Sequence, residues 1–180
     1  MYSVGSLYAG VGGVCLGFIQ AGFKLEWANE FDKYACETYR ENFKHSLHEE
    51  DIWKLDPKKL PKVDVIVGGF PCQPFSKSGN LKGFEDTRGT LFFDILEILN
   101  EHKPKYILLE NVSNLVSHDN GNTYKRITES LKEIGYVIPE QPCIISPHNI
   151  GIPVLRPRVY IPGVFRSDSK INISIKPIDK

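Results

Sequence analysis

The sequence lacks any apolar segment long enough to cross a membrane. Its longest largely apolar segments, Val63–Phe70 and Tyr106–Leu109, fall far short of the roughly 20 residues that a spanning helix needs. Residues Met1–Gly5 show no basic stretch followed by an apolar one, so we expect no secretory signal. These patterns exclude an ordinary helical membrane protein and lead us to expect a cytoplasmic one.

Cysteine is scarce, and neither sign of charge is in excess. The four cysteines include no Cys-x-x-Cys pair, so their spacing favours neither a zinc site nor a disulfide framework, and we expect no metal and a reducing compartment. The 22 Lys and Arg residues equal the 22 Asp and Glu residues. A chain that binds nucleic acid by charge alone is usually more basic. Any such contact must come from a local patch or a partner.

What the chain does contain is typical of one globular domain. It has 180 residues, 41% of them hydrophobic and 24% charged, and no repeat or low-complexity segment divides it. Short β-type segments recur along the sequence. We expect strands at Val4–Tyr8, Leu25–Asn29, a short stretch ending near Ile52, Val63–Val67, Tyr106–Leu109, Tyr136–Ile145 and Arg158–Phe165.

Helical patterns lie between these strands. Apolar residues recur at helical spacing within residues 14–21, 31–43, 91–99 and 124–134. Strands that alternate with helices predict an α/β fold, with a mostly parallel sheet of seven strands and helices on both faces. Ligands of such sheets bind at the carboxyl ends of the strands. The residues just after each strand are therefore the candidates for a functional site.

Glycines mark the turn after the first predicted strand. Gly10, Gly12 and Gly13 stand where that strand turns sharply into a helix. Glycine lets the backbone approach a ligand closely and directs helix N–H groups at it. Cys15 stands where the dinucleotide-binding fingerprint has a glycine, so we favour a nucleoside ligand without a pyrophosphate over NAD. The alternative is a tight turn that binds nothing.

Acidic residues follow the next two predicted strands. Glu30 comes twenty residues after Gly10, where a carboxylate can accept hydrogen bonds from ribose hydroxyls. Asp51 and Ile52 could clamp an adenine between a carboxylate and an apolar side chain. Glu30 taken alone is more often a solvated surface acid. The three features in this order favour a nucleoside site.

A cysteine follows the strand predicted at Val63–Val67. Pro71 and Pro74 flank Cys72 and stiffen the backbone around it, which places its thiol at the ligand edge of the sheet. Cysteine is well suited to nucleophilic attack near neutral pH when a nearby cation favours its thiolate. The other three cysteines, Cys15, Cys36 and Cys143, are expected to be small buried apolar residues.

Residues 70–76 of this chain read Phe-Pro-Cys-Gln-Pro-Phe-Ser. This segment around Cys72 resembles the catalytic motif of the DNA (cytosine-5)-methyltransferase family. Further segments resemble other motifs of the family, in the same order along the chain. They are the glycine turn at residues 8–13, the cofactor residues Glu30 and Asp51–Ile52, the mobile loop and helix at residues 83–92, the acid motif Glu110–Val112 and the arginine motif Arg156–Val159. The likeness is closest to compact enzymes of bacterial restriction–modification systems.

The resemblance implies a fold and a cofactor. The fold would be the Rossmann-like sheet of S-adenosylmethionine-dependent methyltransferases, with a catalytic domain over residues 1–165 and a tail over 166–180 where a target-recognition domain would begin. The cofactor would be S-adenosyl-L-methionine. Its expected contacts are Tyr8, Gly10, Gly12, Gly13, Glu30, Phe31, Asp51, Ile52, Pro71 and Leu91.

The resemblance also implies a reaction. Cys72 would attack C6 of a cytosine flipped out of double-stranded DNA, and Glu110 would donate a proton or hydrogen bond at N3. Arg158 would contact the base carbonyl, and Arg156 would act through its neighbours. The expected DNA contacts are Gln73, Ser76, Ser78, Lys82 and Arg88.

The sequence departs from the family in three places. Val154 stands where the arginine motif has a glutamine, and Ser6 replaces an aspartate common before the glycine turn. The target-recognition domain and the final Gln-x-Gly-Asn-Ser motif are absent from these 180 residues. Either a second polypeptide supplies them, or the chain is a truncated product, or it is a non-catalytic S-adenosylmethionine-binding subunit. The presence of Cys72, Glu110 and Arg158 favours the first two. Transfer RNA is the alternative substrate.

Overall fold

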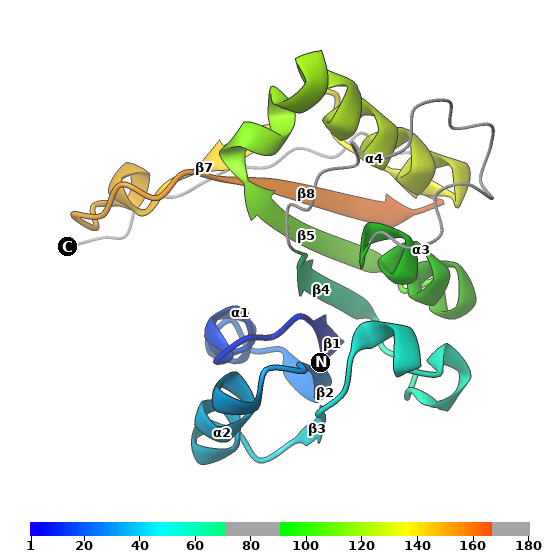
Figure 1. Cartoon of the computed structure of the whole chain (residues 1–180), viewed down its shortest axis with the longest axis vertical. Coiled ribbons are helices and arrows are strands. Elements are labelled where there is room, and N and C mark those ends of the chain that lie inside the picture. Colours follow the sequence, from blue (N-terminus) through cyan, green and yellow to red (C-terminus); the bar gives the residue numbers. More distant parts are fainter. Residues whose placement is uncertain (71–90, 167–180) are drawn as a thin grey trace.

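One mixed sheet forms the centre of the protein. The computed structural model describes residues 1–70 and 91–166. The strand order is β3-β2-β1-β4-β5-β8-β6, with β7 paired to β8, and Figure 1 shows the sheet running from β3 to β8. The strands are β1 (Ser3–Leu7), β2 (Lys24–Asn29), β3 (Ser46–His48), β4 (Val65–Gly69), β5 (Tyr106–Val112), β6 (Tyr136–Val137), β7 (Cys143–Ile145) and β8 (Arg158–Phe165).

The prediction of a mostly parallel sheet is confirmed, but the described residues form a sheet of eight strands, not seven. All pairings among β1 to β5 are parallel, whereas β8 runs antiparallel to β5, β6 and β7. The extra strand arises because the segment predicted as one strand at Tyr136–Ile145 forms β6 and β7 separately. Pro139 and Pro142 lie between the two strands, and proline has no N–H to donate to a ladder.

The third strand lies earlier than predicted. Strand β3 ends at His48, and Ile52 begins a short 3-10 helix, η1 (Ile52–Lys54). The Ile52 side chain is nonetheless buried in the larger core cluster. A short apolar segment gives the same pattern in a strand and in a buried turn, so periodicity could not separate the two.

In the described part of the chain, four α-helices cover the two faces of the sheet: α1 (Gly13–Gln20), α2 (Lys33–Asn42), α3 (Leu91–His102) and α4 (Asn122–Glu133). On one face, Val4, Val65 and Val67 of the sheet pack with Cys15 of α1 and Tyr39 of α2. Figure 1 shows α1 and α2 together beside β1 and β2. Helices on both faces are thus confirmed.

The opposite face carries the larger core. Ile66, Ile107 and Leu109 of the sheet join one cluster with Phe92 of α3 and Ile127 of α4. Apolar residues on α3 recur three and four positions apart, which puts them on one side of the helix. Within the described residues, no helix is long and apolar enough to cross a membrane.

Candidate active site

The glycine turn follows β1 and leads directly into α1. The Ala9 N–H donates to the carbonyl of Asn29 at 3.0 Å, and the Gly12 N–H donates to the carbonyl of Ala9 at 2.9 Å. At Gly12, φ is 93°, and a Cβ there would lie 2.1 Å from the Phe43 ring, so only glycine fits. Among residues 1–70 and 91–166, no atom lies within 4 Å of a Cβ added at Gly10, which leaves open space beside this part of the turn.

The Glu30 carboxylate ties this turn to the end of β2. Its Oε2 accepts the Gly10 N–H at 2.8 Å, and its Oε1 accepts the N–H groups of Phe31 and Asp32, both at 2.9 Å. The side chain is buried, at 8% exposure. A carboxylate has about four acceptor positions, and these bonds occupy three. One position is left for a hydroxyl, so Glu30 builds the turn and still has capacity for a ligand.

Other predicted cofactor residues lie around Tyr8. Burial raises the pKa of the Tyr8 hydroxyl, and the charges of Asp94, Asp51 and Glu30 raise it further, which places these groups within electrostatic reach of one another. The Tyr8 hydroxyl donates to the carbonyl of Leu91 at 3.2 Å and joins the glycine turn to the start of α3. The structure thus brings together predicted residues from four separate segments.

Phe31 and Ile52 differ sharply in their surroundings. The Phe31 side chain is 63% exposed, and the Phe31 N–H donates to the Glu30 carboxylate, whereas the Ile52 side chain is buried. An exposed aromatic ring next to a site is available to stack on a planar base. Because Ile52 lies in the core, it offers little surface to a ligand.

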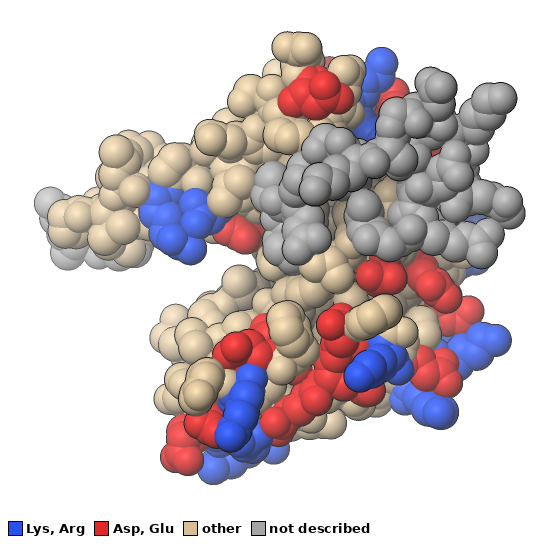
Figure 2. Space-filling view, viewed as in Figure 1, with Lys and Arg blue, Asp and Glu red and all other residues tan. Residues whose placement is uncertain are grey.

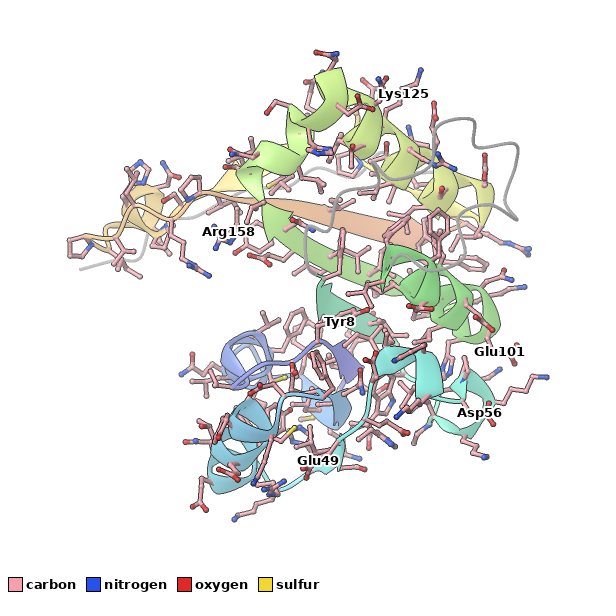
Figure 3. All side chains as sticks on the ribbon, in the orientation of Figure 1. Tyr8, Glu49, Asp56, Glu101, Lys125 and Arg158 are labelled. Carbon is pink, nitrogen blue, oxygen red and sulfur yellow. The ribbon has the colours of Figure 1, made fainter. Side chains whose placement is uncertain are left out.

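An ion pair forms at the carboxyl end of β5. The Arg158 Nε donates to Glu110 Oε1 at 2.8 Å, and both side chains are largely buried, at 18% and 27% exposure. In the β5–β8 ladder, Glu110 pairs with Tyr160 and Val112 pairs with Arg158, so both charged side chains lie on one face of the sheet. In Figure 3 the Arg158 side chain points away from the side that carries α4.

Gly69 of β4 has no side chain, which makes room for the Glu110 carboxylate. Gly69 pairs with Glu110 in the β4–β5 ladder, and a Cβ on Gly69 would lie 3.1 Å from Glu110 Oε2. The prediction put Glu110 just after its strand, but β5 continues to Val112 because β8 pairs with its last residues. Glu110 is therefore a residue of β5, and its Oε1 accepts from Arg158 while its Oε2 lies over Gly69.

Arg156, the other arginine of the motif, lies apart from the Glu110–Arg158 pair. The Arg156 side chain is exposed. Burial and the charge of Glu110 raise the pKa of Tyr160, and the charges of Arg158 and Arg156 act in the opposite direction. The Arg156 N–H donates to Ser146 Oγ at 2.9 Å. Figure 2 shows basic side chains on the segment that projects beyond β7, next to an acidic one. The structure brings Arg158, but not Arg156, to Glu110.

The loop before the arginine motif is held without the glutamine of the family pattern. Val154 is exposed, and its carbonyl accepts the His148 N–H at 3.1 Å. Ser146 and Asn149 form a capping box, in which the Ser146 N–H donates to Asn149 Oδ1 at 2.8 Å. Backbone and cap contacts therefore support the segment that precedes Arg158.

The predicted nucleophile and its predicted neighbours lie outside the described residues. These are Pro71, Cys72, Gln73, Ser76, Ser78, Lys82 and Arg88. The structure gives the two ends of their segment, which leaves β4 at Phe70 and returns at Leu91. Phe70 is buried and packs against Phe92, with ring centroids 5.5 Å apart.

Among the other cysteines, Cys15 and Cys36 are buried as predicted. The prediction for Cys143 is wrong, because it is only half-buried. It lies on β7, a short strand that pairs with β8 alone. An edge position leaves the side chain partly open to solvent.

Sequence reasoning gave no role to two buried asparagines, Asn29 and Asn111, whose side chains donate to backbone carbonyls at the strand ends. Each adjoins a predicted site acid, Glu30 or Glu110, and Asn111 lies within the acid motif. An amide next to a predicted site acid is the sequence signal that could have singled them out.

The family model of C-5 cytosine-specific DNA methylases matches residues 2–180 of the chain. The chain belongs to this family. It is 49% identical over 166 residues to the Type II methyltransferase M.Bsp6I of Bacillus sp. (strain RFL6), covering 91% of this chain and 52% of that protein. It is 44% identical over 165 residues to M.HhaI of Haemophilus parahaemolyticus, covering 92% and 49%. The chain thus spans about half the length of these relatives.

Solved structures agree on the fold. DNMT2 of Spodoptera frugiperda superposes with a TM-score of 0.78 at 25% identity, over 99% of this chain and 57% of that one. The Dnmt2 methyltransferase of S. pombe superposes with a TM-score of 0.76 at 26% identity, over 95% and 53%. The family depends on S-adenosylmethionine. The expected family, fold and relatedness to restriction–modification enzymes are confirmed.

Proposed function

We propose that this chain is the catalytic part of an enzyme that methylates C5 of cytosine in double-stranded DNA, with S-adenosylmethionine as donor. The observation that carries the proposal is the Glu110–Arg158 pair, in which Arg158 Nε lies 2.8 Å from Glu110 Oε1. The pair lies beside the end of β4, where Gly69 is the partner of Glu110. From there the chain reaches Cys72 three residues after Gly69. A nucleophile and an acid would therefore leave adjacent strands at one edge of the sheet.

The residues of the glycine turn fit the donor. Glu30 has acceptor capacity left for a ribose hydroxyl, Phe31 exposes a ring for the adenine, and the space beside Gly10 is open. Tyr8, Gly12, Gly13, Asp51, Pro71 and Leu91 complete the proposed binding set, from which Ile52 is left out because its side chain is buried in the core. When bound, S-adenosylmethionine supplies an electrophilic methyl group and leaves as the thioether.

Cys72 would overcome the poor nucleophilicity of cytosine C5. Its thiolate forms a bond to C6, and the electron pair of the C5–C6 double bond moves toward C5 and N3. For this step Glu110 takes up a proton on Oε2, which leaves Oε1 to accept from Arg158, and it donates that proton at N3, where negative charge develops. After C5 has gained the methyl group, water or hydroxide removes the C5 proton. The C6–S bond then breaks, the ring double bond returns and Glu110 recovers its proton.

Arg158 would orient the acid. Because its Nε–H holds Glu110 Oε1, the proton that Glu110 donates belongs on Oε2, which lies over Gly69 at the end of β4. That oxygen would face the base, and the remaining guanidinium donors of Arg158 would be available to the base carbonyl. Arg156, exposed and separate, would act on this group only through its neighbours.

The substrate base would have to leave the duplex. A thiol and a methyl donor cannot reach C6 and C5 of a stacked base, so enzymes of this kind extrude it. Gln73, Ser76, Ser78, Lys82 and Arg88, in the segment between β4 and α3, remain the proposed DNA contacts. The basic side chains near the arginine motif would add a local patch to a chain without net charge.

We further propose that a second polypeptide, or a further segment, completes the enzyme. Helix α1 is strongly apolar yet buries only Cys15, and Val14, Leu16 and Ile19 are 40–48% exposed. A helix that is apolar on all sides is normally covered. The relatives are about twice as long, and their additional half would include the recognition domain and the final motif. A truncated product and a non-catalytic subunit are the alternatives.

The test is methyl transfer with and without a completing half. The chain is mixed with the C-terminal half of the Bacillus relative, and tritium transfer from labelled S-adenosylmethionine to duplex DNA is counted, with a transfer RNA transcript in parallel. We expect transfer to DNA from the mixture and little from the chain alone. Robust sequence-specific methylation by the chain alone would refute the need for a partner. Transfer to RNA alone, or no transfer in any mixture, would refute the proposed reaction.

A further inference from the structure

Two buried asparagines are sequence neighbours of the proposed site acids. Asn29 is the last residue of β2 and precedes Glu30, and Asn111 follows Glu110 in β5. Both side chains are only 2% exposed. Each donates from its amide to a backbone carbonyl of the segment that leaves the neighbouring strand.

Asn111 acts at the exit of β4. The β4–β5 ladder ends at the Gly69–Glu110 pair, so the carbonyl of Phe70 lies beyond the last backbone pairing. The Asn111 Nδ2 donates to that carbonyl at 3.0 Å, and its Oδ1 accepts the Val112 N–H at 2.8 Å. The second bond fixes which end of the amide faces Phe70. The side chain thus holds the residue two positions before Cys72 against the strand that carries Glu110.

Asn29 acts at the exit of β3. The β2–β3 ladder ends at the Asn29–His48 pair. The Asn29 Nδ2 donates to the carbonyls of His48 and Glu50, at 3.1 and 2.7 Å, and the Glu30 N–H also donates to His48. The amide therefore holds the residue before Asp51 against the strand that leads into Glu30.

We propose that Asn29 and Asn111 are positioning residues that serve the two reactants separately. Asn29 sets the spacing of Glu30 and Asp51 for the cofactor, and Asn111 holds Phe70, at the end of β4, beside Glu110 for the base. Neither amide needs to touch a substrate, since both are buried and directed at backbone. The inference rests on the proposed function and extends it to the residues that hold the site together.

The test compares binding and chemistry in Asp and Ala variants of each asparagine. Asn→Asp keeps the shape and loses the N–H donors but adds a charge, whereas Asn→Ala loses the donors without one. The dissociation constant of S-adenosylmethionine is measured by calorimetry, and the first-turnover methylation rate is measured at saturating cofactor with the completing half present. Melting temperature is recorded for every variant.

Variants at Asn111 should change the first-turnover rate, and variants at Asn29 should change the affinity for S-adenosylmethionine. The Asn111 variants should lower the rate about 100-fold, the effect of a displacement of about 1 Å between reacting groups, with cofactor affinity within about threefold of the parent. The Asn29 variants should weaken cofactor binding roughly tenfold, because the carbonyl of Glu50 loses its donor and the residue before Asp51 is no longer held against β2, with the saturated rate within about threefold.

Tyr136→Phe is the matched control. The Tyr136 hydroxyl donates to the carbonyl of Pro104 at 2.9 Å, a buried bond near the opposite end of β5. Its loss should lower the melting temperature and leave affinity and rate unchanged. If both asparagine sites shift the two quantities together, shift them no more than Tyr136→Phe does, or yield only unfolded variants, the inference is overturned. A parent chain that neither binds the cofactor nor transfers methyl would instead overturn the proposed function itself.

Discussion

Replacing Glu30 by glutamine should loosen the glycine turn by an amount that the structure sets. The carboxylate accepts three backbone N–H groups, and a glutamine can keep the two at Phe31 and Asp32 but must then turn its NH2 toward Gly10. A hydrogen bond to a charged group contributes about 1.5–3 kcal/mol. With the lost charge also weakening the other two bonds, we expect a loss of about 3 kcal/mol in the free energy of unfolding.

Urea unfolding and thermal melting would measure that loss. At roughly 2–4 °C per kcal/mol for a domain of this size, the melting temperature should fall by about 6–12 °C. Glu26→Gln, on the same strand, is the matched control, because Glu26 pairs with an exposed lysine, Lys24, at 2.7 Å. Such surface pairs contribute at most about 1 kcal/mol. Equal losses in the two variants would refute the role given to Glu30.

Three further predictions concern the acid, the turn and the response to alkali. Glu110→Gln should lower the first-turnover rate about 100-fold or more without changing cofactor affinity, and a rate within threefold of the parent would exclude it as the acid. Gly12→Ala should cost about 3–5 kcal/mol in urea unfolding, because φ is 93° and the Cβ meets the Phe43 ring at 2.1 Å, and Phe43→Leu should recover part of it. Burial raises the pKa of Tyr39 and Tyr136, so both stay protonated in the folded chain where the unfolded chain loses its protons. Stability should therefore hold below about pH 9 and fall as the pH rises through about 10, with a shallower fall in Tyr136→Phe. Urea midpoints independent of pH up to about 11 would contradict this.

The sequence predicted the architecture well where local pattern and packing agree. The alternation of strands and helices was enough for the parallel half of the sheet. It was insufficient at Ile52, which is apolar because it packs into the core from a turn, and between Tyr136 and Ile145, where two prolines interrupt the ladder. The extension of β5 to Val112 depends on pairing with β8, which lies some fifty residues later in the chain.

The side-chain connections of the candidate site were not predictable from the sequence. The sequence predicted Glu30, Cys72 and Glu110 just after strands, which holds for Glu30 after β2, whereas Glu110 lies within β5 and Cys72 lies outside the described residues. That the Glu30 carboxylate would bind three backbone N–H groups, or that Asn111 would hold the carbonyl of Phe70, depends on register between strands. The bond from Gly10 to Glu30 and the bond from Asn111 to Phe70 join segments that are far apart in the sequence, so the pattern within one segment does not predict them.

The most direct test of the account is covalent trapping of Cys72. DNA that contains 5-fluorocytosine cannot lose a proton at C5, so an adduct through C6 persists after methyl transfer. With the completing half and S-adenosylmethionine present, the parent chain and Cys143→Ser should each give a DNA-linked band on a denaturing gel, and Cys72→Ser should give none. An adduct that survives in Cys72→Ser, or that peptide mapping assigns to another residue, would contradict the account.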